Sequence, residues 1–184
     1  VIGVIRGEEL ECKINENPTL KKAQDNGMQF HFVSRAAYRQ KESTDFINVL
    51  KKRFGDFYLL PEGGTNALAI KGCEEILTPD DVQFDYICCA VGTGGTLAGL
   101  INASQPHQNV LGFSALKGDF LKDDVSQLVT KDNWRIHTDY HFGGYAKVTK
   151  ELIEFMNVFK AETNILLDPI YNGKMLFGIY DLMK

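Results

Sequence analysis

The sequence predicts an α/β fold built around a largely parallel sheet, and three observations support this class. Strand-like and helix-like segments alternate from one end of the chain to the other, which is typical of strand-helix-strand units. The run FDYICCA at 84–90 is apolar on both faces, so we expect it to be the central strand, covered by helices on both sides. The composition, with 44% hydrophobic and 24% charged residues, is that of an ordinary globular protein.

The first third of the chain predicts strands at 1–5 and 30–33 and helices at 18–26 and 43–54. Asn17 is a suitable N-cap for the first of these helices, Pro18 suits its first turn and Gly27 its end. The second helix carries an apolar stripe at helical spacing and a basic last turn, and Gly55 follows it.

The rest of the chain continues the same alternation. Strands are predicted at 57–60, 84–90, 109–115, 135–140 and 165–167, and helices at 65–77, 97–103, 120–129, 148–162 and 173–183. The sequence Pro-Glu-Gly-Gly at 61–64 suits no regular element and predicts a loop. The helix at 148–162 places apolar side chains on its core face, namely Leu152, Phe155, Met156 and Phe159.

Length and charge exclude several function classes. The 184 residues carry 20 lysines and arginines against 24 aspartates and glutamates, so no basic surface for nucleic acid or anionic membrane is expected. No apolar run approaches the roughly 18 residues that a membrane-spanning helix needs, and we expect a cytoplasmic protein. The four histidines lack metal-ligand spacing, and the four cysteines form no CxxC pair and are predicted to be reduced.

A glycine-rich loop, Gly-Thr-Gly-Gly-Thr at 92–96, connects the strand at 84–90 to the helix that follows. A strand that turns through glycines into a helix N-terminus directs backbone N–H groups at one point, which is a suitable phosphate site. The dinucleotide fingerprint GxGxxG fails because Leu97 takes its last position, and no Walker, nucleophile-elbow or zinc HExxH pattern is present. A tight turn of purely structural use remains the alternative.

Three segments together resemble one enzyme family. The run GTGGTLAGL at 92–100 resembles the phosphate loop of the tryptophan-synthase-β-like, fold type II pyridoxal-phosphate enzymes. LPEGGTNAL at 60–68 and DPIYNGK at 168–174 are similar to segments of its aminocyclopropane-carboxylate deaminase and D-cysteine desulfhydrase branch. The resemblance implies three layers with open, twisted, mostly parallel sheets in two domains. Residues 1–60 would be the remainder of the small domain, and 61–184 most of the large, cofactor-binding domain.

The resemblance also implies roles for particular residues. The phosphate of pyridoxal 5′-phosphate would be held by Thr93, Gly94, Gly95 and Thr96. Tyr171 would lie beside the cofactor ring and act on the substrate, and Tyr145 matches a second active-site tyrosine. The alternative for each tyrosine is a structural aromatic residue. Asn66 would bind the substrate or only cap its helix.

The chain departs from the family pattern at two places. The deaminases have an acid after the motif tyrosine, which pairs with the pyridine nitrogen, whereas this chain has Asn172. The Schiff-base lysine and the Ser-Asn-Gln segment of the family precede the strand matched by 1–5, and no lysine of this chain is a candidate to replace that lysine. We therefore expect a fragment that lacks both ends of the enzyme and is inactive by itself.

The implied function is that of a pyridoxal-phosphate-dependent deaminase or lyase. Its substrate would be a small amino acid of the D-cysteine or 1-aminocyclopropane-1-carboxylate type, converted to ammonia and a keto acid. A homodimer is usual in this class. The alternative is a non-catalytic module that binds a phosphate ligand, or a degenerate paralogue.

Overall fold

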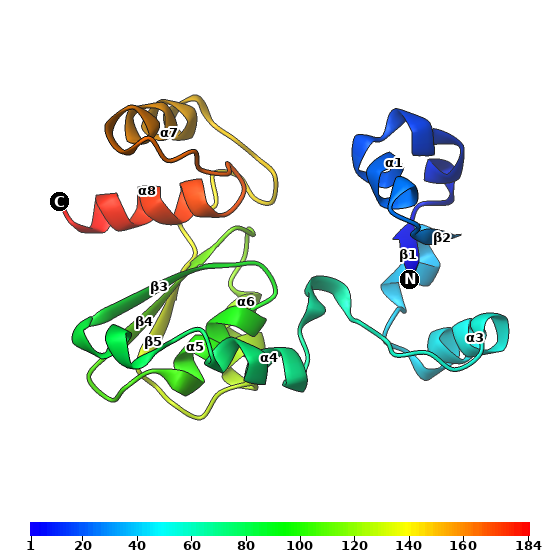
Figure 1. Ribbon diagram of the computed structural model, residues 1–184, viewed down its shortest axis with the longest axis horizontal. Helices are drawn as coiled ribbons and strands as arrows, with labels where there is room; N and C mark the ends of the chain where they lie inside the picture. Colours follow the sequence, from blue (N-terminus) through cyan, green and yellow to red (C-terminus); the bar gives the residue numbers. More distant parts are fainter. The chain divides into compact units, whose positions relative to one another are not determined.

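The computed structural model describes all residues, Val1–Lys184, and the chain divides into two compact units, Val1–Leu59 and Leu60–Lys184 (Figure 1). Both units combine helices with parallel strands, as the alternation in the sequence predicts. None of the helices has the length and apolar character that crossing a membrane requires. The assignment of the units to the small and the large domain of a longer enzyme stays a prediction.

The first unit is built on a parallel pair of strands, β1 (Ile2–Arg6) and β2 (Gln29–Val33). A 3₁₀ segment, η1 (Glu8–Glu16), and helix α1 (Pro18–Asp25) connect them. The predicted cap is confirmed, because the Asn17 side chain accepts hydrogen bonds from the N–H groups of Thr19 and Leu20. Helices α2 (Arg35–Arg39) and α3 (Thr44–Phe54) follow, and serine hydroxyls cap both of them. The sequence predicted α3 but neither η1 nor α2.

The second unit contains a three-stranded parallel sheet in the order β3 (Tyr86–Val91), β4 (Asn109–Ser114), β5 (Trp134–His137). The expectation that the run at 84–90 forms the central strand is wrong, since β4 lies between β3 and β5. Tyr86 at the start of β3 is 62% exposed. An apolar run shows that helices cover a strand, but it carries no information on the order of strands across the sheet.

Helices cover both faces of this sheet (Figure 1). Helix α5 (Gly95–Ala103) packs on β3 and β4 from one side, and α8 (Asn172–Leu182) contacts the same two strands from the other side. Successive residues of β4 face opposite sides of the sheet. A Cβ on Gly112 would meet Leu97 of α5, whereas Phe113 lies against Gly178 of α8. The remaining helical elements of the unit are η2 (Glu62–Gly64), α4 (Ala67–Glu74), η3 (Pro79–Gln83), α6 (Phe120–Ser126) and α7 (Lys150–Thr163).

The core of the second unit lies between α5, α6 and the sheet. Its buried members are Val91, Leu97, Leu100, Ile101, Val110, Leu121 and Val125. On α7 the predicted core face is confirmed for Leu152 and Phe159, which are both buried. This core fixes the end of β3 and the start of α5, so the connecting glycine loop rests on rigid elements.

Two predicted strands do not form. Residues 57–60 have no regular structure, and their leucines and Tyr58 are exposed instead of buried. Residues 165–167 are also irregular, and Leu166 is 77% exposed. A short apolar run becomes a strand only where a neighbouring strand accepts its hydrogen bonds, and neither run has such a neighbour here. The helix predicted at 65–77 is shorter and ends at Glu74.

Candidate phosphate-binding site

A cavity of about 320 Å³ lies at the carboxyl end of β3, within the second unit. Three segments that are distant in sequence line it: residues 63–65, residues 90–97 and Tyr171. Ala69 and Cys73 of α4 complete the lining. The crevice at the carboxyl ends of parallel strands is the usual ligand position in open α/β sheets. The cavity contains the four residues that the sequence predicts to hold a phosphate.

The N-terminus of α5 provides the main polar groups of this cavity. Gly94 is the N-cap in the left-handed conformation, with φ +87°, and no side chain caps the helix. The first intrahelical hydrogen bond runs from the Ala98 N–H to the Gly94 carbonyl, 2.9 Å. The N–H groups of 95–97 therefore precede the first helical bond and can bind an anion, which the positive end of the helix dipole also favours.

Two threonine hydroxyls and two glycines complete this anion site, residues 93–96, which we call the phosphate cradle. Thr93 and Thr96 are exposed at the cavity and carry hydroxyl donors. A Cβ on Gly94 would lie 2.6 Å from the Cγ2 of Val125, and a Cβ on Gly95 would lie 2.7 Å from the Oγ1 of Thr65. Only glycine fits at these positions without displacing a neighbour, so the loop can keep its backbone open to a ligand.

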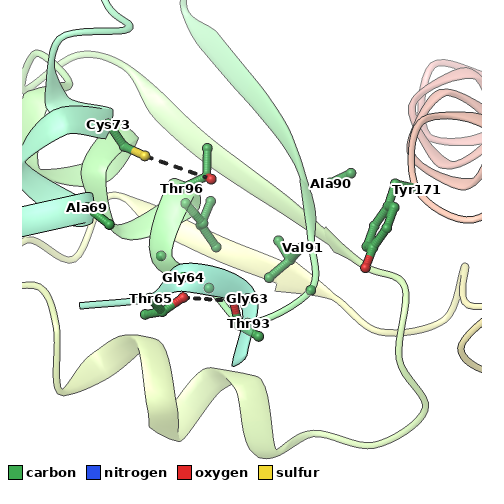
Figure 2. A pocket seen from close by; sticks show the side chains of 14 residues that line it. Gly63, Gly64, Thr65, Ala69, Cys73, Ala90, Val91, Thr93, Thr96 and Tyr171 are labelled. Carbon is green, nitrogen blue, oxygen red and sulfur yellow. Dashed lines mark hydrogen bonds between the residues drawn. The ribbon is translucent and has the colours of Figure 1, made fainter. Parts of the chain in front are cut away.

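The loop before α4 forms a second wall that the sequence analysis did not include in the site. Thr65 lies against the α5 loop, and its Oγ1 is 2.7 Å from the Oγ1 of Thr93 (Figure 2). Gly63, with φ +71°, lies so close to Thr93 that a Cβ would be 2.5 Å from its Oγ1. The sequence signal that could have assigned this wall to the site is the pair Gly63-Gly64, which only Thr65 separates from the helix cap Asn66.

Asn66 does not line the cavity. Its side-chain oxygen accepts a hydrogen bond of 2.9 Å from the Ala69 N–H and caps α4. The capping alternative therefore describes this side chain, and its role as a substrate contact stays a prediction.

Tyr171 lies on the side of the cavity next to the strand end. Figure 2 shows its phenol oxygen directed toward the end of β3, where a Cβ on Gly92 would be 3.3 Å from that oxygen. Burial raises the pKa of Tyr171, and the neighbouring Tyr145 and Asp168 raise it further. Tyr171 is therefore protonated at neutral pH and can donate a hydrogen bond or a proton into the cavity.

Asp168 fixes the backbone that carries Tyr171. Its carboxylate accepts hydrogen bonds from the N–H groups of Ile170, Tyr171 and Asn172, at 3.0, 2.7 and 2.9 Å. Burial acts to raise the pKa of Asp168, but these backbone hydrogen bonds outweigh it and lower the pKa below its ordinary value. Asn172 contributes its N–H to this turn, and its side chain is not part of the cavity lining.

The structure brings Tyr145 next to Tyr171, although Tyr145 itself does not line the cavity. The two ring centroids are 6.2 Å apart in an edge-to-face arrangement, and Tyr145 is 56% exposed. Lys174 supports the loop that carries Tyr145, because its Nζ donates hydrogen bonds of 2.9 Å to the carbonyls of His141 and Gly144. Burial lowers the pKa of Lys174. Lys174 is the last residue of the DPIYNGK segment, and the resemblance implies no role for it.

The residues present fit the phosphate end of pyridoxal phosphate. The cradle offers backbone N–H groups, two hydroxyls and glycines whose missing side chains leave room for a ligand. The phenol of Tyr171 lies at the same cavity. No lysine is among the residues that line it.

Comparison with known proteins supports the resemblance seen in the sequence. No protein-family model matches the chain. A putative 1-aminocyclopropane-1-carboxylate deaminase of Pyrococcus horikoshii is 28% identical over 98% of the chain, which spans 60% of that relative. The bifunctional D-cysteine desulfhydrase/1-aminocyclopropane-1-carboxylate deaminase, mitochondrial, of Arabidopsis thaliana is 32% identical over 83% of the chain, and the match spans 44% of that relative. A D-cysteine desulfhydrase of Klebsiella pneumoniae is 27% identical over 67% of the chain.

A solved structure described as an ACC deaminase homologue matches the fold with a TM-score of 0.74. The match covers 97% of this chain and 59% of that structure, at 24% sequence identity. It confirms the α/β fold with parallel sheets. The chain thus spans between about two fifths and three fifths of the length of the relatives that it matches.

Proposed function

We propose that this chain, a homologue of aminocyclopropane-carboxylate deaminases and D-cysteine desulfhydrases, forms the phosphate end of the cofactor site in a pyridoxal-phosphate-dependent deaminase or lyase. Its substrate is a small amino acid of the D-cysteine or 1-aminocyclopropane-1-carboxylate type, and its products are ammonia and a keto acid. The observation that carries the proposal is the meeting of residues 63–65, 92–96 and Tyr171 at one cavity. These are parts of the three segments on which the sequence resemblance depends.

Pyridoxal phosphate, when bound, supplies an electron-withdrawing ring that stabilises negative charge on the amino-acid carbon. The groups of this chain that would hold its phosphate are the N–H groups of 95–97 and the hydroxyls of Thr93 and Thr96. Hydrogen bonds to a charged group are stronger than those between neutral groups, so these donors would hold the ligand by its phosphate end, at the cavity that Tyr171 also lines.

Tyr171 is the proposed proton carrier of the site. Its raised pKa keeps the phenol protonated at neutral pH, so the side chain acts by donating its proton and not by standing as a phenolate. Tyr145 lies beside it and is open to solvent, so it can return a proton to Tyr171 from water. The Asp168 turn holds the backbone of Tyr171 during this exchange.

We further propose that the 184 residues alone do not turn over a substrate. This part of the proposal is supported by the cavity lining, which includes no lysine to attach the cofactor. The buried lysine near the tyrosines, Lys174, has its Nζ bonded to two backbone carbonyls. Covalent attachment requires a neutral amine that can reach the carbonyl carbon of the cofactor.

The first experiment tests the phosphate cradle without lysine chemistry. Pyridoxamine 5′-phosphate carries the phosphate but no aldehyde, so it cannot react with surface lysines. We expect it to bind at least about ten-fold more tightly than unphosphorylated pyridoxamine, with inorganic phosphate as a competitor. Equal affinity of the two amines would contradict the proposed site.

The second experiment tests activity. The chain is incubated with pyridoxal phosphate, reduced with borohydride and mapped by mass spectrometry, and sulfide release from D-cysteine is assayed in parallel. We expect no stoichiometric lysine adduct and no sulfide, and a single modified lysine with turnover would overturn the proposed inactivity. The product of the complete gene, assayed with D-cysteine and 1-aminocyclopropane-1-carboxylate, should release ammonia. A complete product that binds the phosphate ligand and stays inactive would favour the non-catalytic alternative.

A further inference from the structure

Lys174 is the largest charged side chain in the interior of the second unit. It is 1% exposed, and its Nζ donates two hydrogen bonds of 2.9 Å, to the carbonyls of His141 and Gly144. A buried ammonium group is costly unless hydrogen bonds satisfy its protons. Both acceptors belong to one loop, residues 141–145, so the interaction of Lys174 is concentrated on the segment that carries Tyr145.

That loop has a backbone conformation that needs support. Phe142 within the loop and Ala146 directly after it have positive φ values of 52° and 55°, which residues other than glycine rarely adopt. Gly143 and Gly144 between them also have positive φ. The loop supplies few contacts of its own: the Gly144 N–H donates to the His141 carbonyl at 3.0 Å, and the Gly143 N–H donates to the His141 Nδ1 at 2.9 Å. Lys174 binds the same His141 carbonyl and so closes this turn from inside.

Two residues of the DPIYNGK segment thus fix the two tyrosines by separate contacts. The Asp168 carboxylate accepts the N–H of Tyr171, and three residues after that tyrosine Lys174 holds the loop of Tyr145. The rings are brought to 6.2 Å by these two anchors on one turn and helix start. Lys174 does not line the cavity, so its ammonium group serves the loop and not a ligand.

We propose that Lys174 is a positioning residue that holds the 141–145 loop, and with it Tyr145, against Tyr171. The inference deepens the proposed function and rests on it for the use of the two tyrosines. It assigns to this lysine a role other than covalent attachment of the cofactor. The carbonyl of Gly144 also accepts the Lys147 N–H at 3.1 Å, so loss of the Lys174 contact should loosen the turn up to residue 147.

The test compares hydrogen exchange in the chain, its Lys174→Met variant and a Lys147→Met control. Lys147 is an exposed lysine in the neighbouring segment, so its replacement removes the same charge without removing the buried contacts. We expect amide exchange at Gly143, Gly144 and Lys147 to be roughly ten-fold faster in the Lys174→Met variant and unchanged at Gly143 and Gly144 in the control. Unchanged exchange in both variants would overturn the inference.

A second variant keeps the test decisive if Lys174→Met does not fold. Lys174→Arg keeps the positive charge and N–H donors, so we expect amide exchange at Gly143 and Gly144 to stay within about three-fold of the unaltered chain. Exchange roughly ten-fold faster in a folded Lys174→Arg variant would overturn the inference. Pyridoxamine 5′-phosphate binding is measured in every folded variant and should be unchanged, because the cradle at 93–96 is separate. Failure of the unaltered chain to bind pyridoxamine 5′-phosphate would refute the proposed function alone. An adduct of pyridoxal phosphate at Lys174, trapped with borohydride, would refute the positioning role.

Discussion

The hydroxyl oxygens of Thr65 and Thr93 lie 2.7 Å apart although 28 residues separate them in the chain. One hydroxyl belongs to the loop before α4 and the other to the loop before α5, so this hydrogen bond joins the two loops that line the cavity. A phosphate group that approaches the N-terminus of α5 therefore meets a paired set of hydroxyls that is already oriented. Because these side chains are oriented before the ligand binds, binding loses less conformational entropy.

This pair leads to a prediction for the Thr65→Val variant. Valine keeps the shape of threonine but replaces the hydroxyl with a methyl group, so the Thr93 hydroxyl, a proposed phosphate donor, loses the partner that orients it. We expect pyridoxamine 5′-phosphate to bind about five- to ten-fold more weakly, which corresponds to about 1–1.4 kcal/mol. Thr78→Val, which removes a hydroxyl outside the lining of the cavity, is the control and should leave binding unchanged. Equal affinity in the Thr65→Val variant would show that Thr65 plays no part in the site.

The glycines of the same loop allow a matched comparison of two substitutions. Gly63 and Gly64 have similar positive φ values, 71° and 74°, so alanine costs about 1–2 kcal/mol of backbone strain at either position. The Cβ of Gly63→Ala would also lie 2.5 Å from Thr93, whereas Gly64 has open space around it. We expect equal losses of stability from backbone strain, but a larger loss of phosphate affinity in Gly63→Ala, whose Cβ displaces Thr93, than in Gly64→Ala. Equal affinities in titrations of the two variants would contradict the contact between this loop and Thr93.

The elements that sequence reasoning predicted correctly are those with local signals. Asn17 caps its helix as predicted, because the cap needs only the N–H groups two and three residues ahead of it. The glycine loop at 92–96 was found for the same reason, since an apolar strand, a loop with three glycines and a helix follow one another directly.

The features that sequence reasoning missed depend on contacts between distant residues. The runs at 57–60 and 165–167 have strand-like composition but no partner strand, and the sequence does not show which strands become neighbours. Lys174 donates its hydrogen bonds to carbonyls that are 30 and 33 residues away in the chain, and Thr65 pairs with a hydroxyl 28 residues away. Such pairings are set by the packing of α4, α5 and α8 around the sheet and not by any local pattern.

Helices α4 and α5 support the two walls of the cavity, and their contact depends on Gly99. A Cβ on Gly99 would lie 2.4 Å from the Cβ of Cys73 and 2.7 Å from the Ile70 carbonyl. We therefore expect Gly99→Ala to destabilise the fold by about 1–3 kcal/mol through overpacking. Gly72→Ala in α4 meets no atom within 4 Å and should stabilise by about 0.5–1 kcal/mol, since alanine favours helix. Urea unfolding followed by the fluorescence of Trp134, the only tryptophan, measures both, and a Gly99→Ala variant as stable as Gly72→Ala would contradict this packing.

The rates at which the cysteines react with a thiol reagent report on the same cavity. Cys73 lines it, and its thiol lies 3.9 Å from the Thr96 hydroxyl. Burial, followed by the neighbouring Cys73 and Cys88, raises the pKa of Cys89 to about 11. At pH 8 we expect iodoacetamide to modify exposed Cys12 first and Cys89 at least about ten-fold more slowly, because the thiolate is the reactive form.

A phosphate ligand should change this order at one position only. Pyridoxamine 5′-phosphate in the cradle covers the Thr96 side of the cavity and should slow modification of Cys73 without changing that of Cys12, which serves as the internal control. Peptide mass spectrometry after timed labelling measures each rate. Equal protection of Cys12 and Cys73 would indicate a general effect of the ligand and not occupation of this cavity.

The Asp168 turn predicts how the stability of the second unit depends on pH. Three backbone hydrogen bonds lower the pKa of Asp168 below its ordinary value of 3.8 despite partial burial, so folding favours the ionised carboxylate. Its contribution is complete above about pH 4 and is lost as the pH falls through the lower folded-state pKa. Asp168→Asn removes the charge and one acceptor oxygen, and we expect it to cost about 1–2 kcal/mol at pH 7.

The same change should matter less as the pH falls, because the carboxyl group of the unaltered chain then becomes neutral as well. We expect the difference in unfolding free energy between the chain and Asp168→Asn to shrink below pH 4, in urea titrations followed by Trp134 fluorescence. Asp132→Asn, at an exposed aspartate, is the control. A difference that stays constant from pH 7 to pH 3 would mean that the Asp168 charge does not hold this turn. Tyr171 would then owe its orientation to the packing of α8 alone.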